Sequence, residues 1–264
     1  KVKGNLLECA FHNWTYDGGG QCVKIPYCEK IPPKARTRSY PVREINDTVL
    51  IWHDPEFGEP EYEVEPLAEY GKPGWTPKWH RFKITIKTHP REVIENVVDK
   101  GHLLPIHGYD VDNWLPMWNR HMCGELMWGK HRRLAADVQD DKLYVRNITM
   151  GPAYQYTWQI QDSNQFDSCI LTSWCPIDEN TLEYWFGVIV HADPKQFTPE
   201  MLEAAAEGYC KASYDAFMED VYIWERKLYR PTPLLCANDG PIAKIRRWYT
   251  QFYTDRAQVD NSQY

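Results

Sequence analysis

The residues best suited to chemistry lie in one short stretch, where Asn96, Asp99 and His102 recur at every third position. On a helix this spacing places the three side chains along one side. His107 comes five positions after His102, too far round a regular helix for both rings to point at one place. Pro105 lies between them and removes a helical N–H, so a kink there can bring His107 back. Two imidazoles beside a carboxylate are the beginning of a metal site, whose third ligand must come from elsewhere in the chain.

A carboxylate on a predicted C-terminal helix is a candidate for that ligand. The segment 198–200 combines an N-cap hydroxyl, a first-turn proline and an early acid, which predicts a helix running to about Leu228. Asp220 falls within the apolar stripe of this helix and would be buried there. Because burying an unpaired charge is costly, Asp220 needs a metal ion, an Arg or Lys, or several backbone donors as its partner. The stripe consists of Leu202, Ala205, Tyr209, Ala216, Phe217, Ile223 and Trp224.

A second candidate pair of metal ligands lies near the start of the chain. Cys9 and His12 form a C-x-x-H pair, a spacing that lets a thiolate and an imidazole from one loop bind the same metal centre. The alternative is a buried cysteine beside an unrelated histidine. The eight cysteines are spread through the chain and lack the pattern of a secreted disulfide framework, so we expect a reducing, cytoplasmic environment.

Composition limits the classes of function. The chain has 264 residues, enough for one large domain or two smaller ones, and 30 basic against 37 acidic side chains give a net charge of −7. This balance argues against a nucleic-acid or anionic-membrane binder. The 12 Trp and 17 Tyr suit either an apolar ligand cavity or an aromatic-rich core. We expect neither a transmembrane span nor a signal peptide.

The elements that must position these residues predict an α+β protein. Short β runs punctuated by Pro and Gly predict a small β module over residues 1–58, and the second domain is expected over 59–264. Pro90 opens the helix that carries the histidine stretch. Residues 108–130 show no period and predict a long irregular loop, of the kind that often forms a lid. Successive strands with short connections predict an antiparallel sheet. The strands are expected over 37–42, 48–53, 79–87, 142–149, 153–161, 168–174 and 182–190.

Taken together, these features resemble the Rieske-type non-haem iron oxygenases. The segment 9–12 looks like the second half of the family's cluster-binding motif, and the segment 99–107 matches its D-x2-H-x4-H iron motif. Asp220 lies where the family has its late carboxylate ligand. Four further segments narrow the resemblance to the oxygenase component of 3-ketosteroid 9α-hydroxylases, with sterol 7-desaturases as nearest relatives. These segments are 25–27, 52–55, 96–99 and the tail that contains 239–241 and 246–253.

The resemblance implies roles for the residues of the iron site. His102, His107 and Asp220 would form a 2-His-1-carboxylate triad on Fe(II), with room for O2 beside the substrate. Asp99 would accept a hydrogen bond from a ligating imidazole and link it to the Rieske cluster of a neighbouring subunit. Asn96 lies one helical turn before Asp99 and is a second candidate catalytic residue.

The resemblance also implies a [2Fe–2S] cluster, for which this chain shows half of the ligands. Cys9 and His12 would bind different irons, and His12 would face Asp99 of a neighbouring subunit. The family's upstream C-x-H pair is absent, since only eight residues precede Cys9. Either the start of the module lies outside this chain or the cluster is lost, and we expect the former. Ala10 stands where the family usually has proline, which affects the stiffness of the loop.

The resemblance implies O2-dependent hydroxylation of a steroid, as part of steroid and lipid degradation. The implied fold is a partial Rieske β module followed by a helix-grip catalytic domain, an antiparallel sheet around the long C-terminal helix. The implied assembly is a homotrimer that receives electrons from an NAD(P)H-dependent flavin or ferredoxin-type reductase. Three alternatives stay open: a sterol 7-desaturase, a cluster-free steroid-binding protein of the same fold, and a zinc hydrolase, since two His and one Asp also suit zinc.

Overall fold

The structure is a computed structural model that describes residues 1–132, 142–162, 166–253, 255 and 258. The chain divides into two compact units, Lys1–Pro66 and Leu67–Tyr264, and each is described by itself. The domain boundary expected after residue 58 stays a prediction. The α+β class predicted from the sequence is confirmed by the elements that follow.

The first unit consists of short antiparallel strands around a small apolar centre that includes the buried Cys22. Its sheet has the order β1-β2-β3-β4, and β5 pairs with β6 as a separate hairpin. This hairpin turns at Asn46 and Asp47, which both adopt positive φ, as a tight two-residue turn requires. Pairing extends from the turn back to Val42, so the strand predicted over 37–42 is wrong. The strands are β1 (Val2–Lys3), β2 (Leu6–Glu8), β3 (Thr15–Tyr16), β4 (Cys22–Lys24), β5 (Val42–Ile45) and β6 (Thr48–Ile51).

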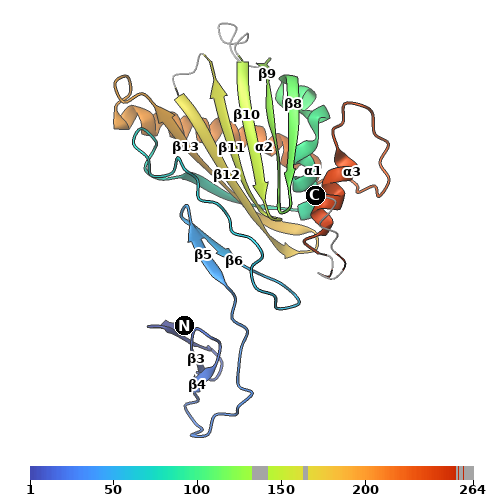
Figure 1. Cartoon of the computed structure of the whole chain (residues 1–264). Coiled ribbons are helices and arrows are strands. Elements are labelled where there is room, and N and C mark those ends of the chain that lie inside the picture. The colour runs from blue at the N-terminus through green and yellow to red at the C-terminus, as the bar shows by residue number, and fades with distance from the viewer. Residues whose placement is uncertain (133–141, 163–165, 254, 256–257, 259–264) are drawn as a thin grey trace. The chain divides into compact units, whose positions relative to one another are not determined.

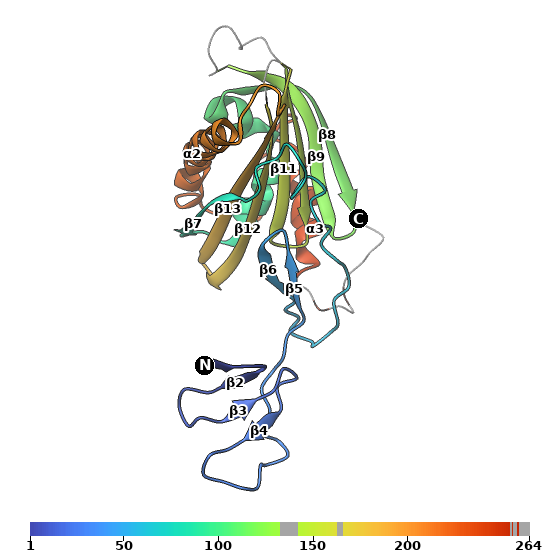
Figure 2. The same ribbon diagram turned by 90° about the vertical axis from the view of Figure 1, so that its left-hand side faces the viewer.

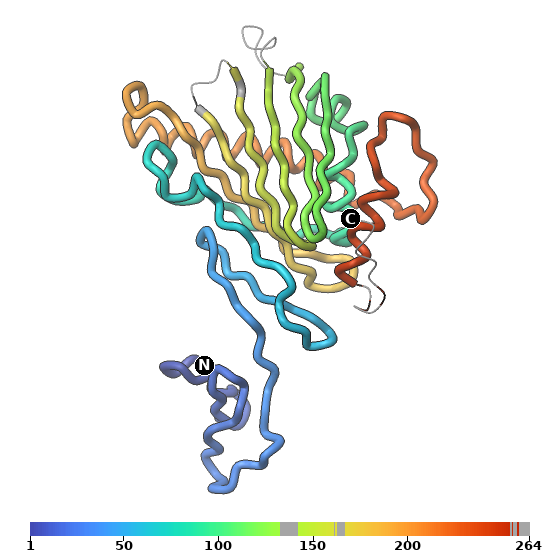
Figure 3. Tube along the Cα trace, in the orientation of Figure 1, coloured from blue at the N-terminus to red at the C-terminus, as the bar shows by residue number. Residues whose placement is uncertain are grey.

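The second unit is organised around a seven-stranded antiparallel sheet, labelled strand by strand in Figure 1. Its order is β7-β13-β12-β11-β10-β9-β8, so each strand from β8 to β13 pairs with its neighbours in sequence. Figure 3 shows the successive hairpins that this order produces. The predicted antiparallel sheet is confirmed. The strands are β7 (His80–Ile86), β8 (Tyr109–Asn119), β9 (Met122–His131), β10 (Lys142–Met150), β11 (Tyr154–Gln161), β12 (Phe166–Asp178) and β13 (Thr181–Ala192).

Two of these strands replace the irregular lid predicted over residues 108–130. The segment forms β8 and β9, which pair along their length, so that prediction is wrong. β8 lies at the edge of the sheet, where Pro116 is tolerated, and its register shifts between Val111 and Asn113. The proline and the register shift interrupt the alternation of apolar and polar residues. β8 therefore cannot be recognised as a strand from the sequence pattern.

Helices cover one face of the sheet, which we call the inner face, and Figure 2 shows α2 lying along it. The hydroxyl of Thr198 accepts a hydrogen bond from the N–H of Met201 at 3.3 Å, which confirms the predicted helix start. The helix ends at Trp224, before the predicted Leu228. In the described part of the chain, no helix has both the length and the apolar character that crossing a membrane demands. The α-helices are α1 (Pro90–Val98), α2 (Pro199–Trp224) and α3 (Ile242–Thr250).

The core between the inner face and the helices is rich in aromatic rings. Trp174 stacks on Tyr184 with 5.6 Å between ring centroids, and Tyr184 stacks on Phe217 of α2 at 4.6 Å. Trp248 of α3 is fully buried, and its indole N–H donates to the carbonyl of Arg120 at 2.6 Å. These rings join the sheet to two helices, so part of the high tryptophan and tyrosine content serves core packing.

Candidate metal centre

The segment that carries both histidines changes helix type twice. α1 ends before Asp99, a 3₁₀ turn covers Lys100–His102, and a π-helix covers Leu103–His107. The regular helix predicted to continue through Asp99 and His102 is therefore wrong. Hydrogen-bonded residues in a π-helix are five apart, which is the spacing of His102 and His107. The wide turn brings the two rings together, where the sequence predicted a proline kink.

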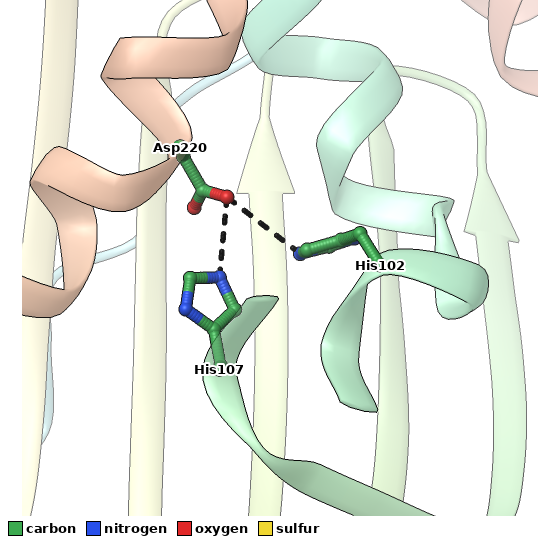
Figure 4. A group of neighbouring side chains, drawn as sticks. All are labelled: His102, His107 and Asp220. Atoms are coloured by element: carbon green, nitrogen blue, oxygen red, sulfur yellow. Dashed lines mark hydrogen bonds and ion pairs between the residues drawn. The ribbon is translucent and has the colours of Figure 1, made fainter. Parts of the chain in front are cut away.

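The side chains of His102, His107 and Asp220 meet in space, and one ligand atom from each lies within 4.8 Å of the others. Figure 4 shows both imidazoles directed at the carboxylate. Asp220 Oδ1 lies 3.2 Å from His107 Nε2 and 4.0 Å from His102 Nε2. The ring centroids are 5.2 Å apart and the rings are nearly perpendicular, at 83°. Two ring nitrogens and one carboxylate oxygen at this separation fit a single divalent metal ion such as Fe(II) or Zn²⁺.

Asp220 is buried, with 8% of its surface exposed, as its place in the apolar stripe predicts. Within the described residues no lysine or arginine forms an ion pair with it, and the side chains that face its Oδ1 are His102 and His107. The Asn96 Nδ2 donates to Asp220 Oδ2 at 3.4 Å and lies 3.5 Å from His102 Nε2. Asn96 therefore occupies one carboxylate oxygen and leaves Oδ1 facing both imidazoles. Of the three kinds of partner open to Asp220 from the sequence, this arrangement favours a metal ion.

The proton balance of His107 reflects two acidic neighbours. Burial lowers the pKa of His107, but the hydrogen bond and charge of Asp220 and the charge of Glu219 raise it, and the net pKa lies above the ordinary value. Glu219 Oε2 lies 3.3 Å from His107 Nδ1. In the metal-free protein the protonated ring thus stabilises the fold below the ordinary histidine pKa, and this contribution is lost as pH rises through the raised pKa. The surroundings of His107 favour positive charge beside Asp220.

The orientation of His102 is set by a nearby backbone carbonyl. The Nδ1–H of His102 donates to the carbonyl oxygen of Asp99 at 2.5 Å, which leaves Nε2 directed at Asp220. The Asp99 carboxylate is farther from the ring, at 3.9 Å, and its side chain is 38% exposed. Metal-binding imidazoles commonly donate their second N–H to a carbonyl or a carboxylate, and here the carbonyl makes that contact. The Asp99 carboxylate is free to face a further group.

An ion-pair cluster beside this centre was not predicted from the sequence. Arg246 of α3 forms a bidentate pair with Glu95 of α1, at 2.9 Å and 3.0 Å. Lys227 lies 2.7 Å from Glu92 and 3.4 Å from Glu95, and both glutamates are buried. Because Glu95 precedes Asn96, the cluster fixes the helix that leads into the centre. Glu92 and Glu95, one turn apart on the predicted helix, were the sequence feature that could have indicated this cluster. Their burial, however, depends on α3 and on the loop that carries Lys227.

The other candidate ligands, Cys9 and His12, lie in the turn between β2 and β3, and both are exposed. The Cys9 N–H donates to the carbonyl of Trp14 at 2.8 Å, and the Asn13 N–H donates to the carbonyl of Cys9 at 3.1 Å. This pair offers a thiolate and an imidazole, half of a Rieske ligand set. Within the described residues, the triad of His102, His107 and Asp220 is the one group of at least three potential ligands. The described residues therefore do not complete a cluster site.

Comparison with known proteins decides the family. A family model described as 3-ketosteroid 9α-hydroxylase C-terminal domain matches residues 51–253, and a model of the Rieske [2Fe-2S] domain matches residues 1–41. The chain belongs to the 3-ketosteroid 9α-hydroxylase family of Rieske oxygenases. The resemblance inferred from the sequence motifs is thereby confirmed.

Individual relatives of this family member support the assignment. A probable 3-ketosteroid-9-alpha-monooxygenase, oxygenase component, of Rhodococcus rhodochrous is 34% identical over 266 residues, covering 96% of the chain and 66% of the relative. A cholesterol 7-desaturase of Hemicentrotus pulcherrimus is 30% identical over 285 residues, covering 97% of the chain and 58% of the relative. The chain thus spans less than two thirds of the length of each of these two relatives. A crystal structure of dicamba monooxygenase bound to dicamba matches with a TM-score of 0.72 at 18% identity, over 98% of this chain and 82% of that chain, and shares the fold.

Proposed function

We propose that the protein acts as the oxygenase component of a 3-ketosteroid 9α-hydroxylase-type monooxygenase and hydroxylates a steroid with O2. The observation that carries this proposal is the convergence of His102, His107 and Asp220, in a chain that belongs to the family. We assign the three side chains as the ligands of a mononuclear Fe(II). When bound by such a triad, Fe(II) supplies the oxygen-activating chemistry at the coordination positions that the protein leaves open.

The protein's own groups orient the ligands in this proposal. The Asp99 carbonyl holds the proton of His102 on Nδ1 and keeps Nε2 available as a ligand. Asn96 binds Oδ2 of Asp220, so that the second oxygen faces the metal. The buried aromatic and aliphatic residues of the inner face keep the surroundings apolar, which suits a steroid and limits access of water.

Cys9 and His12 would hold part of a Rieske [2Fe–2S] cluster, which would supply electrons in this proposal. Cys9 and His12 provide two ligands, and two further ligands are required that the described residues do not supply. We propose an NAD(P)H-dependent flavin or ferredoxin-type reductase as the electron source, and a homotrimer in which His12 of one subunit faces Asp99 of the next. The exposed carboxylate of Asp99 is consistent with such a partner.

The Asp99→Ala variant tests this electron path. It is expected to retain iron, because the backbone carbonyl that orients His102 is present in any residue. Turnover is expected to fall by about tenfold or more, as is common when a group behind a metal ligand is removed. Iron content and the rate of steroid oxidation with reductase measure the two effects. Asp110→Ala, which removes an exposed acid paired with Arg132, is the control. Wild-type turnover in Asp99→Ala would show that Asp99 is not on the path.

Similarity to a cholesterol 7-desaturase favours one second candidate, desaturation of a sterol at the same centre. Product mass distinguishes hydroxylation from desaturation. The protein that carries a complete cluster is incubated with reductase and O2, once with 4-androstene-3,17-dione as substrate and once with cholesterol. A ketosteroid product heavier by one oxygen atom supports hydroxylation, and a sterol product lighter by two hydrogens supports desaturation. If the protein binds one iron per chain and neither steroid changes mass, both candidates are wrong. Zinc as the metal retained from cells would favour a hydrolase instead.

A further inference from the structure

The inner face of the sheet carries an unusual polar position beneath the segment that holds the metal ligands. On β9, alternate residues Cys123, Glu125 and Met127 share this face. Cys123 belongs to the core cluster that includes residues of α1, and Met127 belongs to a second cluster, against which Leu103, the residue that follows His102, is packed. Glu125 therefore lies between one apolar residue of the α1 cluster and one of the cluster that Leu103 covers.

Glu125 and its cross-strand neighbour Asn147 are both buried, with 3% and 7% of their surfaces exposed. Within the described part of the chain, Glu125 Oε2 and Asn147 Oδ1 are buried atoms without a hydrogen-bond partner. The Asn147 Nδ2 donates to the hydroxyl of Thr157 on the next strand at 3.1 Å, which turns Oδ1 away from that strand. Two neighbouring residues of the inner face thus each carry an unpaired oxygen.

Burial raises the pKa of Glu125 well above its usual range, which favours the protonated form of the carboxyl. In that form the carboxyl is a hydrogen-bond donor as well as an acceptor. No cation faces it among the described residues, which excludes a carboxylate held by an ion pair. A buried polar group left unpaired costs stability, so these two atoms call for a polar partner. The keto or hydroxyl group of a steroid, carried on an otherwise apolar ring system, is such a partner.

We propose that Glu125 and Asn147 bind an oxygen substituent of the steroid and so orient its ring system beneath the metal ligands. In its protonated form the Glu125 carboxyl donates a hydrogen bond to a keto or hydroxyl oxygen, and a hydroxyl group in turn donates to Asn147 Oδ1. A keto group is held by Glu125 alone, whereas a hydroxyl group pairs with both residues. This inference rests on the proposed steroid substrate, and it identifies positioning residues that make no contact with the metal.

The test measures steroid binding to the metal-free chain, so that it does not depend on iron or on turnover. Dissociation constants are determined by calorimetry for 4-androstene-3,17-dione, for 5α-androstan-3β-ol and for the oxygen-free 5α-androstane. Glu125→Met is expected to weaken binding of the two oxygenated steroids by about tenfold or more and to leave androstane unchanged, since only the former lose a hydrogen bond to a buried group. Glu125→Gln keeps a neutral donor and is expected to bind within about threefold of wild type.

Asn147→Leu provides a second, independent arm. It is expected to weaken binding of the 3β-ol more than that of the dione, because the keto group does not use Oδ1. Glu183→Gln, which alters a glutamate paired with Lys83 on the same sheet, is the control and is expected to change none of the three constants. The Asn147 arm also keeps the proposal testable if Glu125→Met folds poorly, which circular dichroism of each variant shows.

The outcomes separate this inference from the proposed function. The inference is supported if wild type binds the oxygenated steroids more tightly than androstane, if Glu125→Met abolishes this preference, and if Asn147→Leu weakens binding of the 3β-ol more than that of the dione. If wild type binds them but neither variant changes the preference, the inference is overturned while the steroid oxygenase proposal stands. If wild type binds none of the three, the steroid substrate class itself is wrong and the inference fails with it. If wild type binds all three steroids with the same dissociation constant, the inference is overturned but the proposed function is not.

Discussion

Asp220→Ala is expected to abolish retention of Fe(II) and, with it, oxidation of steroid. The carboxylate contacts both imidazoles through Oδ1, at 3.2 Å and 4.0 Å, so its removal takes one of three ligands from the centre. Loss of a group behind a ligand already costs about 10–100-fold in metal affinity, and loss of the ligand itself is expected to cost more. The measurement is the iron bound per chain after anaerobic loading and desalting, followed by turnover.

Asp215→Ala is the matched control for this variant. Asp215 lies on the same helix but is exposed and pairs with Lys211 at 2.5 Å, so its loss is expected to leave iron content unchanged. The free energy of unfolding of the metal-free wild type and Asp220→Ala should be compared as well. If iron is lost because the variant unfolds, the free energy of unfolding falls together with the iron content. Iron retained at the wild-type level in folded Asp220→Ala would remove Asp220 from the ligand set.

Glu95→Ala is expected to lower the free energy of unfolding by about 3–5 kcal/mol, the cost of leaving buried charges without their partner. Glu95 is 6% exposed and Arg246 19%, so water screens this pair weakly. The variant leaves the guanidinium of Arg246 without its bidentate partner and Lys227 with Glu92 alone. Urea unfolding measures the loss. Iron retention is expected to fall too, because α1 presents Asn96 to the centre from the next position.

An exposed pair in the same unit is the control for this prediction. Glu183→Ala removes the partner of Lys83, an ion pair at 2.8 Å whose side chains are 54% and 31% exposed, and is expected to change stability by less than about 1 kcal/mol. Replacing Glu95 and Arg246 together with apolar residues of similar volume is expected to recover much of the loss, since no unpaired charge then remains. A loss in Glu95→Ala no larger than that in Glu183→Ala would show that α1 is held mainly by its apolar contacts.

The sequence alone determined the features that depend on local spacing. The alternation of residues predicted most strands of the large sheet, and the hydroxyl, proline and acid at 198–200 predicted where α2 begins. The spacing of Asp99, His102 and His107 indicated the iron motif. The apolar stripe of α2 showed that Asp220 is buried and therefore needs a partner.

Only the tertiary structure decided how those pieces meet. The π-helix that brings His107 beside His102 replaces a predicted proline kink, and the strand pairing of β8 with β9 overrides a sequence without visible period. The hydrogen bond from Asn96 to Asp220 and the register of Glu125 with Asn147 join residues that no local pattern connects. Periodicity and capping act over a few neighbouring residues and can be seen in the sequence. Contacts between distant segments, in contrast, follow from the packing free energy of the whole unit, which no single stretch of sequence contains.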